Sequence, residues 1–269
     1  MPTRIKIAVS GIAGRMGQRV ACEILNRAEE LELVAGFARK SSAYVGRDIG
    51  KVIGIDPIGL SVSDGDDGGL NGADLLIDFT HPTALKKHLD WCLNEKAGLV
   101  LGTTGFTPKD LECLQDAKKE IPILYSANTS IGVALVTKIV KGIAAQLDDS
   151  FDIEIIETHH RNKKDAPSGT AIMLAEAAAA GRDTEISNHS ADQRYSKAAA
   201  RETGSIGLQS LRGGDVIGDH TVMFLGNSER IEITHKATNR GLFAKGAIRA
   251  AIWLKKQPAG LYSIQDLIK

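Results

Sequence analysis

The sequence predicts an α/β protein in which a mostly parallel sheet covered by helices is joined to a second α+β domain with a mixed or antiparallel sheet. Two observations lead to this prediction. Apolar strands alternate with helical patterns along the first half of the chain, as in parallel sheets covered on both faces. In the second half, strand-like runs follow one another closely across short glycine-containing turns, which is typical of antiparallel or mixed sheets.

The first half begins with an apolar strand at residues 5–9, which ends at a glycine turn. A helical pattern follows, with Met16, Val20 and Ile24 on one face. Further strands are predicted over residues 31–37, 75–79, 99–101 and 121–125, and helices over residues 83–94 and from Thr107 onward. The last of these helices has a cap residue, a proline at its first position and an acid in its first turn, which are helix start signals.

The pattern changes near residue 130. A long helix is predicted over residues 131–147, and a strand with alternating Phe151, Ile153 and Ile155 follows it. The later elements are strands over residues 205–211, 220–224 and 230–235, a helix over residues 242–255 and a short tail from Leu261. The polar, weakly patterned stretch over residues 181–203 is expected to be a long loop or extension.

Composition excludes several classes of protein. Lys plus Arg and Asp plus Glu both number 33 and aromatic residues make up 4%, which favours neither nucleic acid nor an acidic membrane as a partner. Cys22, Cys92 and Cys113 lie far apart in helical patterns, so we expect small buried hydrophobic residues and no metal site or disulfide. The start has no apolar signal region and no run approaches the ~18 apolar residues of a membrane helix, so a soluble, cytoplasmic protein is expected.

The turn after the first strand carries three glycines, in the run Gly11-Ile-Ala-Gly14-Arg-Met-Gly17. A dinucleotide pyrophosphate can bind at such a strand-to-helix turn, on helix N–H groups that only small residues leave accessible. The context predicts a Rossmann-like domain for a nicotinamide dinucleotide, and a tight structural turn is the alternative. The predicted cofactor contacts in this loop are Gly11, Ile12, Ala13, Gly14, Arg15 and Met16.

The end of the second strand bears on which nicotinamide cofactor binds. An acidic residue there would bind the ribose 2′-hydroxyl of NADH. The chain instead has Ala38 followed by Arg39 and Lys40, and these two cations favour the 2′-phosphate of NADPH. We therefore expect NADPH to be preferred.

The most informative stretch runs from Glu154 to Ala171. It places two histidines and three cations directly before a Pro-Ser-Gly-Thr turn that opens a helix, at the end of a strand, where catalytic loops commonly lie. The backbone N–H groups of Ser168 and Gly169, at the positive end of that helix, can bind an anion. Together these features predict a site for an acidic small molecule that undergoes proton transfer, and a solvated charged surface is the alternative.

The same stretch closely resembles the signature of the 4-hydroxy-tetrahydrodipicolinate reductase family, also called dihydrodipicolinate reductase, of lysine biosynthesis. The resemblance extends less tightly to the Gly11 loop, Asp78-Phe-Thr80, Gly102-Thr-Thr-Gly105, Ala127-Asn128 and Glu232-Ile-Thr-His235-Lys236-Ala. It implies reduction of a cyclic unsaturated dicarboxylate to tetrahydrodipicolinate by NADPH or NADH, without a metal, in a homotetramer.

The resemblance also implies roles for individual residues. It implies His159 as proton donor or acceptor, which suits the neutral-pH titration of histidine, and Lys163 as proton donor. It implies His160, Gly169 and Thr170 as substrate contacts, to which we add Ser168 from its place at the helix start. On the cofactor side it points to Gly102, Thr103, Thr104, Ser126, Ala127, Asn128, Thr129, Arg240 and Phe243. Ser126 and Thr129 stand where the family pattern has Ala and Phe.

These assignments predict how the chain is divided by function. Residues 1–129 together with 240–269 are expected to form the dinucleotide-binding domain. Residues 130–239 are expected to form the substrate-binding and oligomerisation domain.

Two other functions stay open at this point. The first is another two-domain amino-acid dehydrogenase, such as homoserine or aspartate-semialdehyde dehydrogenase. The latter needs a nucleophilic cysteine, which no catalytic-looking loop of this chain supplies, and the former needs no site for two carboxylates. The second is a nicotinamide-binding sensor without chemistry, which would have little use for His159 and Lys163 as a pair.

Overall fold

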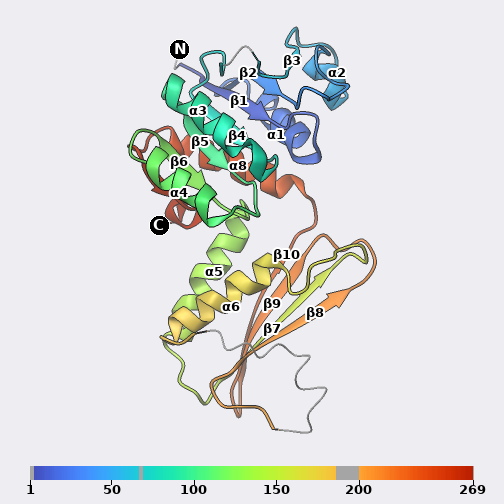
Figure 1. Cartoon of the computed structure of the whole chain (residues 1–269). Helices are drawn as coiled ribbons and strands as arrows, with labels where there is room; N and C mark the ends of the chain where they lie inside the picture. The colour runs from blue at the N-terminus through green and yellow to red at the C-terminus, as the bar shows by residue number, and fades with distance from the viewer. Residues whose placement is uncertain (1–2, 67–68, 186–199, 269) are drawn as a thin grey trace. The chain divides into compact units, whose positions relative to one another are not determined.

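The structure of the chain is a computed structural model that describes residues 3–66, 69–185 and 200–268 (Figure 1). The chain divides into two compact units. The first comprises Met1–Ser130 and Gly241–Lys269, and the second comprises Ile131–Arg240. Most of the loop expected over residues 181–203 lies outside the described residues.

The first unit is built on a seven-stranded sheet in which every pairing is parallel. Its strands are β1 (Ile5–Ser10), β2 (Leu31–Phe37), β3 (Val62–Ser63), β4 (Leu75–Asp78), β5 (Gly98–Leu101), β6 (Pro122–Tyr125) and β11 (Gly260–Tyr262). They lie in the order β11-β6-β5-β4-β1-β2-β3, so the order reverses between β1 and β4. This is the topology of doubly wound nucleotide-binding sheets, and the prediction of a Rossmann-like domain is confirmed.

Helices cover both faces of this sheet (Figure 1). They are α1 (Arg15–Leu25), α2 (Ile49–Ile53), α3 (Leu85–Glu95), α4 (Pro108–Ala117), α8 (Gly241–Leu254) and the 3-10 turns η1 (Pro82–Ala84) and η2 (Ile264–Leu267). Helices α1 and α8 pack against each other, and α3 and α4 pack on a core that contains Leu89, Trp91 and Leu114. Helix α8 approaches so closely that a Cβ on Gly246 would lie 1.7 Å from the carbonyl oxygen of Thr129.

Two details of this unit differ from the prediction. The short elements α2, β3 and β11 were not predicted, because two to five residues are too few to display a hydrophobic period. The prediction that all three cysteines are buried is wrong for Cys113, which is exposed, whereas Cys92 is buried and Cys22 is half-buried. Helix α4 turns Leu114 and Ala117 inward and leaves Cys113 on its solvent side.

The second unit holds a four-stranded sheet with two helices packed together on it. Its elements are α5 (Ile131–Ala144), β7 (Asp152–His159), α6 (Gly169–Gly181), β8 (Ile206–Arg212), β9 (Asp219–Leu225) and β10 (Arg230–Lys236). The order is β10-β9-β7-β8, with β7 parallel to β8 and the other pairs antiparallel, so the predicted mixed sheet is confirmed. Ile153, Ile155, Val222 and Phe224 point from the sheet into the core beneath the helices.

Within the described ranges, every helix is too short or too polar to span a bilayer.

Candidate active site

The glycine loop lies at the point where the order of the parallel strands reverses, between β1 and β4. Gly11 has a φ of +74°, and a Cβ there would lie 2.9 Å from Cγ2 of Thr80. The N–H groups of Gly11 and Ile12 both donate to the carbonyl oxygen of Phe37, at 2.9 and 3.0 Å. The loop is therefore held between the ends of β2 and β4, where ligands bind in such sheets.

The start of α1 is closely packed and open to a ligand at the same time. Gly14 is its cap residue and makes no side-chain hydrogen bond to the helix, and no acid lies in the first turn. A Cβ on Gly17 would lie 2.1 Å from the carbonyl oxygen of Gly11, so only glycine allows this approach of helix to loop. The free helix N–H groups and the small residues beside them fit the pyrophosphate of a dinucleotide.

Two cavities open beside this loop. The larger, of about 900 Å³, is lined by the glycine loop, by the end of β2 and by the segment after β4. The smaller, of about 520 Å³, lies between Met16, the segment after β4 and the segment after β5. Of the predicted cofactor contacts, those that line these cavities are Gly11, Ala13, Gly14, Met16, Arg39, Lys40, Gly102, Thr103 and Thr104.

The remaining predicted cofactor residues lie outside both cavities. Ile12 has a fully buried side chain and Arg15 is exposed. In the loop after β6, the Ser126 hydroxyl donates to the carbonyl of Asn128 at 2.6 Å, and Ala127 is exposed. The Thr129 hydroxyl, 1% exposed, donates to the carbonyl of Phe243 at 2.8 Å and so holds α8. Arg240 belongs to the second unit.

A buried polar chain supports the loops around the cavities. Asp78, at the end of β4, accepts from Nδ1 of His88 at 2.7 Å, and Nε2 of His88 lies 2.9 Å from the Ser10 hydroxyl. The other carboxylate oxygen of Asp78 accepts from the backbone and hydroxyl of Thr80, at 2.8 and 2.6 Å, and from Thr103 at 3.3 Å. One buried carboxylate thus ties together the segments that follow β1, β4 and β5.

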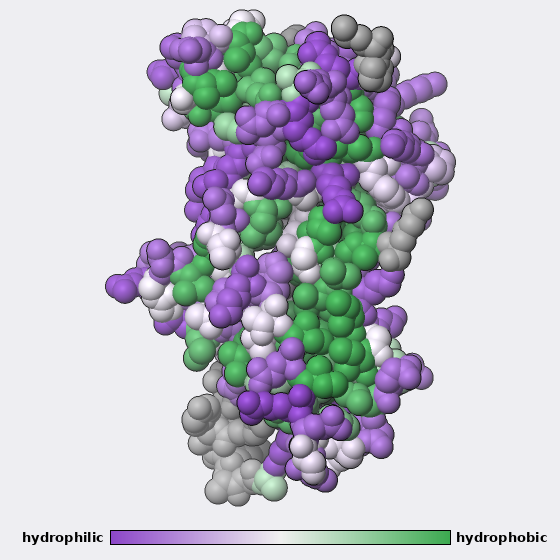
Figure 2. Space-filling model, turned by 180° about the vertical axis from the view of Figure 1, so that it is seen from behind, coloured by the Kyte–Doolittle hydropathy of each residue, from purple (hydrophilic) through white to green (hydrophobic). Residues whose placement is uncertain are grey.

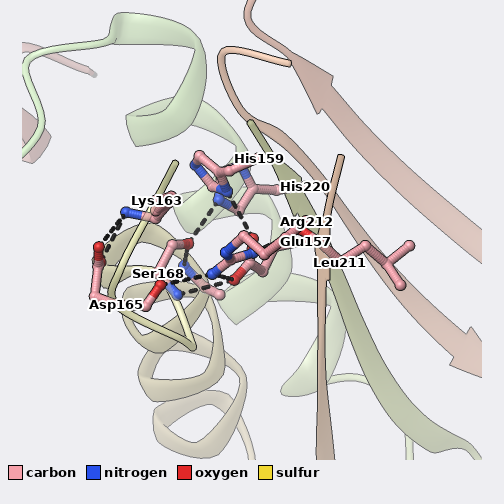
Figure 3. A network of polar contacts seen from close by, with 9 residues as sticks. Glu157, His159, Lys163, Asp165, Ser168, Leu211, Arg212 and His220 are labelled. Atoms are coloured by element: carbon pink, nitrogen blue, oxygen red, sulfur yellow. Dashed lines mark hydrogen bonds and ion pairs between the residues drawn. The ribbon is translucent and has the colours of Figure 1, made fainter. Parts of the chain in front are cut away.

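In the second unit, strand β7 places a polar cluster at its end (Figure 3). The inward positions Ile153 and Ile155 are followed, at the same spacing of two, by Glu157 and His159. His159 pairs with Arg212 of β8, and Glu157 pairs with His220 of β9. Apolar residues therefore line the inner part of this strand, and titratable residues occupy the same face at its end.

The centre of the cluster is Glu157, whose side chain has no exposed surface. Nδ1 of His159 lies 2.6 Å from Oε2 of Glu157. Arg212 donates to both carboxylate oxygens, Nη1 to Oε2 at 2.7 Å and Nη2 to Oε1 at 2.8 Å. The backbone N–H of Ser168 donates to Oε1 at 3.1 Å. Figure 3 shows these groups converging on one carboxylate.

These contacts govern protonation in the cluster. Burial alone would raise the pKa of Glu157, but hydrogen bonds from Arg212, His159 and Ser210 outweigh it and lower this pKa to about 2. Burial lowers the pKa of His159, an effect that the Glu157 carboxylate opposes and that Lys163 and Arg212 reinforce. Glu157 is therefore ionised at neutral pH, and the imidazole of His159 is mostly neutral before any ligand binds.

Lys163 and His160 lie in the loop that follows β7. The ammonium of Lys163 donates to both carboxylate oxygens of Asp165, at 2.9 and 2.7 Å, so Asp165 braces this loop. The backbone of His160 donates to the carbonyl of Val216 at 2.7 Å. The loop between β8 and β9 thus holds the histidine segment in place.

The start of α6 differs in one respect from the prediction. The N–H of Ser168 is donated to Glu157 and is not available to an anion, and the Ser168 hydroxyl caps the helix by accepting from Ala171 at 3.2 Å. Gly169 is exposed, and a Cβ there would meet no atom within 4 Å. The space for an anion at this helix start therefore lies beside Gly169 and the half-buried Thr170.

His220 completes the cluster from β9. Its Nε2 lies 3.0 Å from the Ser168 hydroxyl, and its ring meets that of His159 edge to face at 5.2 Å between centroids. Burial lowers the pKa of His220 to about 4, and repulsion from His159 in its protonated form acts in the same direction. It is therefore a neutral structural contact at physiological pH.

The prediction assigned no role to four residues that build the two sites. Glu157 could have been found, because an acid at an inward position of an alternating strand is a warning of a buried functional group. His88, Arg212 and His220 reach their sites through tertiary pairing over long stretches of chain, and no local pattern marks them.

In the part of the chain that the structure describes, no group of three or more histidine, cysteine or acidic side chains could hold a metal ion.

Comparison with known proteins agrees with this arrangement. The family described as "Dihydrodipicolinate reductase, N-terminus" matches residues 5–129, and "Dihydrodipicolinate reductase, C-terminus" matches residues 132–268. The 4-hydroxy-tetrahydrodipicolinate reductases of Nitrosospira multiformis and Pseudomonas fluorescens are each 44% identical to the chain, over 98% of its length and 97% and 98% of theirs.

Solved structures extend the comparison. The dipicolinate-bound dihydrodipicolinate reductase from Paenisporosarcina sp. TG-14 has a TM-score of 0.76 and 26% identity, and the alignment covers 99% of this chain and 100% of that one. The DAP dehydrogenase of C. glutamicum has a TM-score of 0.52 at 14% identity, covering 98% and 94%, which shows a shared fold alone.

Acid should destabilise the second unit through Glu157. A carboxyl with a lowered folded-state pKa adds stability above its unfolded pKa and loses that contribution as the pH falls towards the folded value. The free energy of unfolding should therefore fall as the pH drops from about 4.5 to about 2. Urea denaturation at several pH values over this range measures the free energy of unfolding, with Glu157→Gln as the reference protein. The difference in stability between the two proteins should shrink as the pH falls, and a constant difference would contradict the assignment.

Proposed function

The chain belongs to the dihydrodipicolinate reductase family, and we propose that it performs the reaction of this family with His159 and Lys163 as the source of the proton and NADPH as the preferred cofactor. It is an oxidoreductase that reduces 4-hydroxy-tetrahydrodipicolinate in lysine biosynthesis and uses a nicotinamide cofactor. The observation that supports the proposed proton source most strongly is the cluster at the end of β7. It holds a histidine on a buried carboxylate, with a lysine four residues further on.

The reduction needs one hydride and one proton. When bound, the reduced nicotinamide supplies the hydride. His159 holds its Nδ1–H against Glu157, which leaves Nε2 as the ring nitrogen that exchanges a proton. The ammonium of Lys163, steadied by Asp165, is the second proton donor of the site.

The substrate anion binds between the histidine loop and the start of α6 in this proposal. Gly169 and Thr170 receive one carboxylate at the positive helix end, where Ser168 fixes the first turn. His160 and Lys163 receive the other. A dianion beside His159 favours the imidazolium form, so substrate binding itself charges the group that donates the proton.

The cofactor lies along the glycine loop, with its pyrophosphate at the start of α1. Arg39 and Lys40, at the edge of the larger cavity, face the 2′-phosphate in this proposal. The two cations are not equivalent, because Lys40 is ion-paired with Asp66 at 2.5 Å. Met16, Gly102, Thr103 and Thr104 line the smaller cavity, and we place the nicotinamide on that side together with the loop from Ser126 to Thr129 and Phe243. Arg240 stays a predicted cofactor contact.

The functional division of the chain is also proposed. Residues 1–129 with 240–269 bind the dinucleotide, and residues 130–239 bind the substrate and form the oligomer, which we propose to be a homotetramer. The face of the second sheet opposite α5 and α6 carries Ile156, Leu211 and Met223, and no described helix covers it. Figure 2 shows a broad apolar area on the second unit. Of the exposed large apolar residues of this unit, Leu211 lies on the uncovered sheet face, and Leu135, Ile139 and Ile172 lie on α5 and α6.

Proton supply is tested by replacing its two donors. His159→Gln and Lys163→Ala should each lower kcat by roughly 10²–10⁴-fold, the typical contribution of a positioned acid. The assay is oxidation of NADPH at about 340 nm, the nicotinamide absorbance, with substrate generated in situ from pyruvate and aspartate semialdehyde. The control Lys164→Ala, next to Lys163 and exposed, should leave kcat unchanged.

The pH dependence gives the sign of the His159 contribution. Because the protonated ring donates, kcat/KM should fall as the pH rises through the free-enzyme pKa, which burial places below its ordinary value of 6.5. The corresponding limb of kcat should lie at higher pH, since the bound dianion favours the charged ring. His159→Gln should remove both limbs, and a profile unchanged in that variant would refute the role of His159.

Cofactor preference is tested at the end of β2. Arg39→Ala should lower the ratio of kcat/KM for NADPH to that for NADH by roughly 10- to 100-fold, the worth of a charged hydrogen bond. Lys40→Ala should have a smaller effect, because Asp66 already neutralises that cation. Ala38→Glu should shift the preference towards NADH. A ratio near one in the unaltered enzyme, insensitive to Arg39→Ala, would contradict the preference for NADPH.

The oligomer is tested by light scattering. The molar mass should be four times the chain mass of 28.7 kDa. Leu211→Asp places a charge on the uncovered sheet face and should lower the mass, whereas Leu111→Asp, at an exposed leucine of α4 in the first unit, should not. A monomer mass for the unaltered chain would exclude the tetramer.

A further inference from the structure

We propose that Glu157, held by Arg212, is a positioning residue that fixes the tautomer of His159 and the start of α6 through one carboxylate. The proposal rests on the proposed role of His159 and names the group that makes this role possible. The two residues concerned, Glu157 and Arg212, are not among the proposed contacts of the substrate or the cofactor.

Each oxygen of the Glu157 carboxylate has a separate partner. Oε2 faces Nδ1 of His159 at 2.6 Å, and Oε1 faces the backbone N–H of Ser168 at 3.1 Å. The guanidinium of Arg212 donates to both oxygens, at 2.7 and 2.8 Å, in the two-pronged geometry that only arginine supplies. Arg212 therefore fixes the plane of the carboxylate, and this plane sets the direction of the other two hydrogen bonds.

The charge of Glu157 decides which nitrogen of His159 carries the proton. An ionised carboxylate has no hydrogen to donate, so Nδ1 must be the donor of the 2.6 Å contact. Nε2 is then the nitrogen that exchanges a proton, and among the described residues it has no hydrogen-bond partner. A Cβ on Gly218 would lie 2.9 Å from Nε2, so the absence of a side chain at this position keeps the nitrogen clear.

The second oxygen acts on the anion-binding end of α6. By accepting from the Ser168 backbone it holds the cap residue, whose hydroxyl in turn accepts from Ala171 and fixes the first turn. Arg212 extends the same support by donating to the carbonyl of Asp165 at 2.7 Å, and Asp165 holds Lys163. One ion pair thus sets the positions of the histidine, the lysine and the helix start.

The charged and titratable groups around His159 make the proposal testable. They are Glu157 on its own strand, Lys163 and Asp165 in the following loop, Arg212 on β8 and His220 on β9. Glu157 favours the charged ring, and Arg212 disfavours it. Removing one or the other should therefore move the titration of His159 in opposite directions, which loosening of the structure alone would not do.

The experiment compares Glu157→Gln with Arg212→Met in the full-length enzyme. Both variants should lower kcat by about tenfold or more, with KM for NADPH within about twofold, because both disturb the acid and not the cofactor loop. The pH at which kcat/KM and kcat fall, a dependence that His159→Gln should remove, should be lower in Glu157→Gln and higher in Arg212→Met. Binding of NADPH, followed by its fluorescence, and thermal unfolding verify that each variant is folded.

A matched control lies on the same strand. Glu154 is also ion-paired, with Arg201, but it points to the other face of β7, and Glu154→Gln should leave kcat and the pH limb unchanged. The proposal is overturned if Glu157→Gln keeps the kcat and limb of the unaltered enzyme, or if both variants move the limb the same way. Should Glu157→Gln not fold, the direction of the shift in Arg212→Met decides alone. If His159→Gln itself leaves the fall of activity with pH unchanged, the proposed role of His159 is refuted. That result is distinguishable from an unchanged pH profile in Glu157→Gln alone, which would refute only the positioning role of Glu157.

Discussion

The second unit depends on a carboxylate that has no contact with water. A buried ionised group is costly unless it is paired and its hydrogen-bonding capacity is filled, and Glu157 meets this condition only when β7, β8 and the start of α6 are all in place. The same contacts that make the charge tolerable also hold the ring of His159 and the start of α6. Assembly of the fold and assembly of the site are consequently the same event in this part of the molecule.

The first unit solves a similar problem with small residues. Gly11 and Gly17 let a helix start and a strand end approach more closely than any side chain would allow, and Asp78 and His88 hold the neighbouring segments from beneath. In both units a buried acid at or near the end of a strand organises loops that themselves remain open. Rigid support beneath accessible backbone is what a site for anionic ligands requires.

The fold could be predicted because it follows from local sequence patterns, namely the periodicity of apolar residues and the turn and cap residues between elements. The alternation of apolar strands and helices, the glycine run after the first strand and the cap at Thr107 each specify an element without reference to the rest of the chain. The motif from His159 to Thr170 located the candidate site for the same reason, since its residues are neighbours in sequence. What could not be predicted is distant pairing: Arg212 reaches Glu157 only because β8 lies parallel to β7 in one register. The exposure of Cys113 was missed because the hydrophobic periodicity of a short helix does not by itself say which side of the helix faces the core.

Helix α8 and strand β11 belong to the first unit, although they follow the whole of the second unit in the chain. During synthesis, these segments leave the ribosome only after the second unit, and until then the parallel sheet lacks an edge strand and part of the cover on one face. The second unit is continuous in sequence and needs no later segment to close its core. Domains generally fold as units as they emerge, so the cluster around Glu157 can form before the parallel sheet that precedes it in the gene is complete.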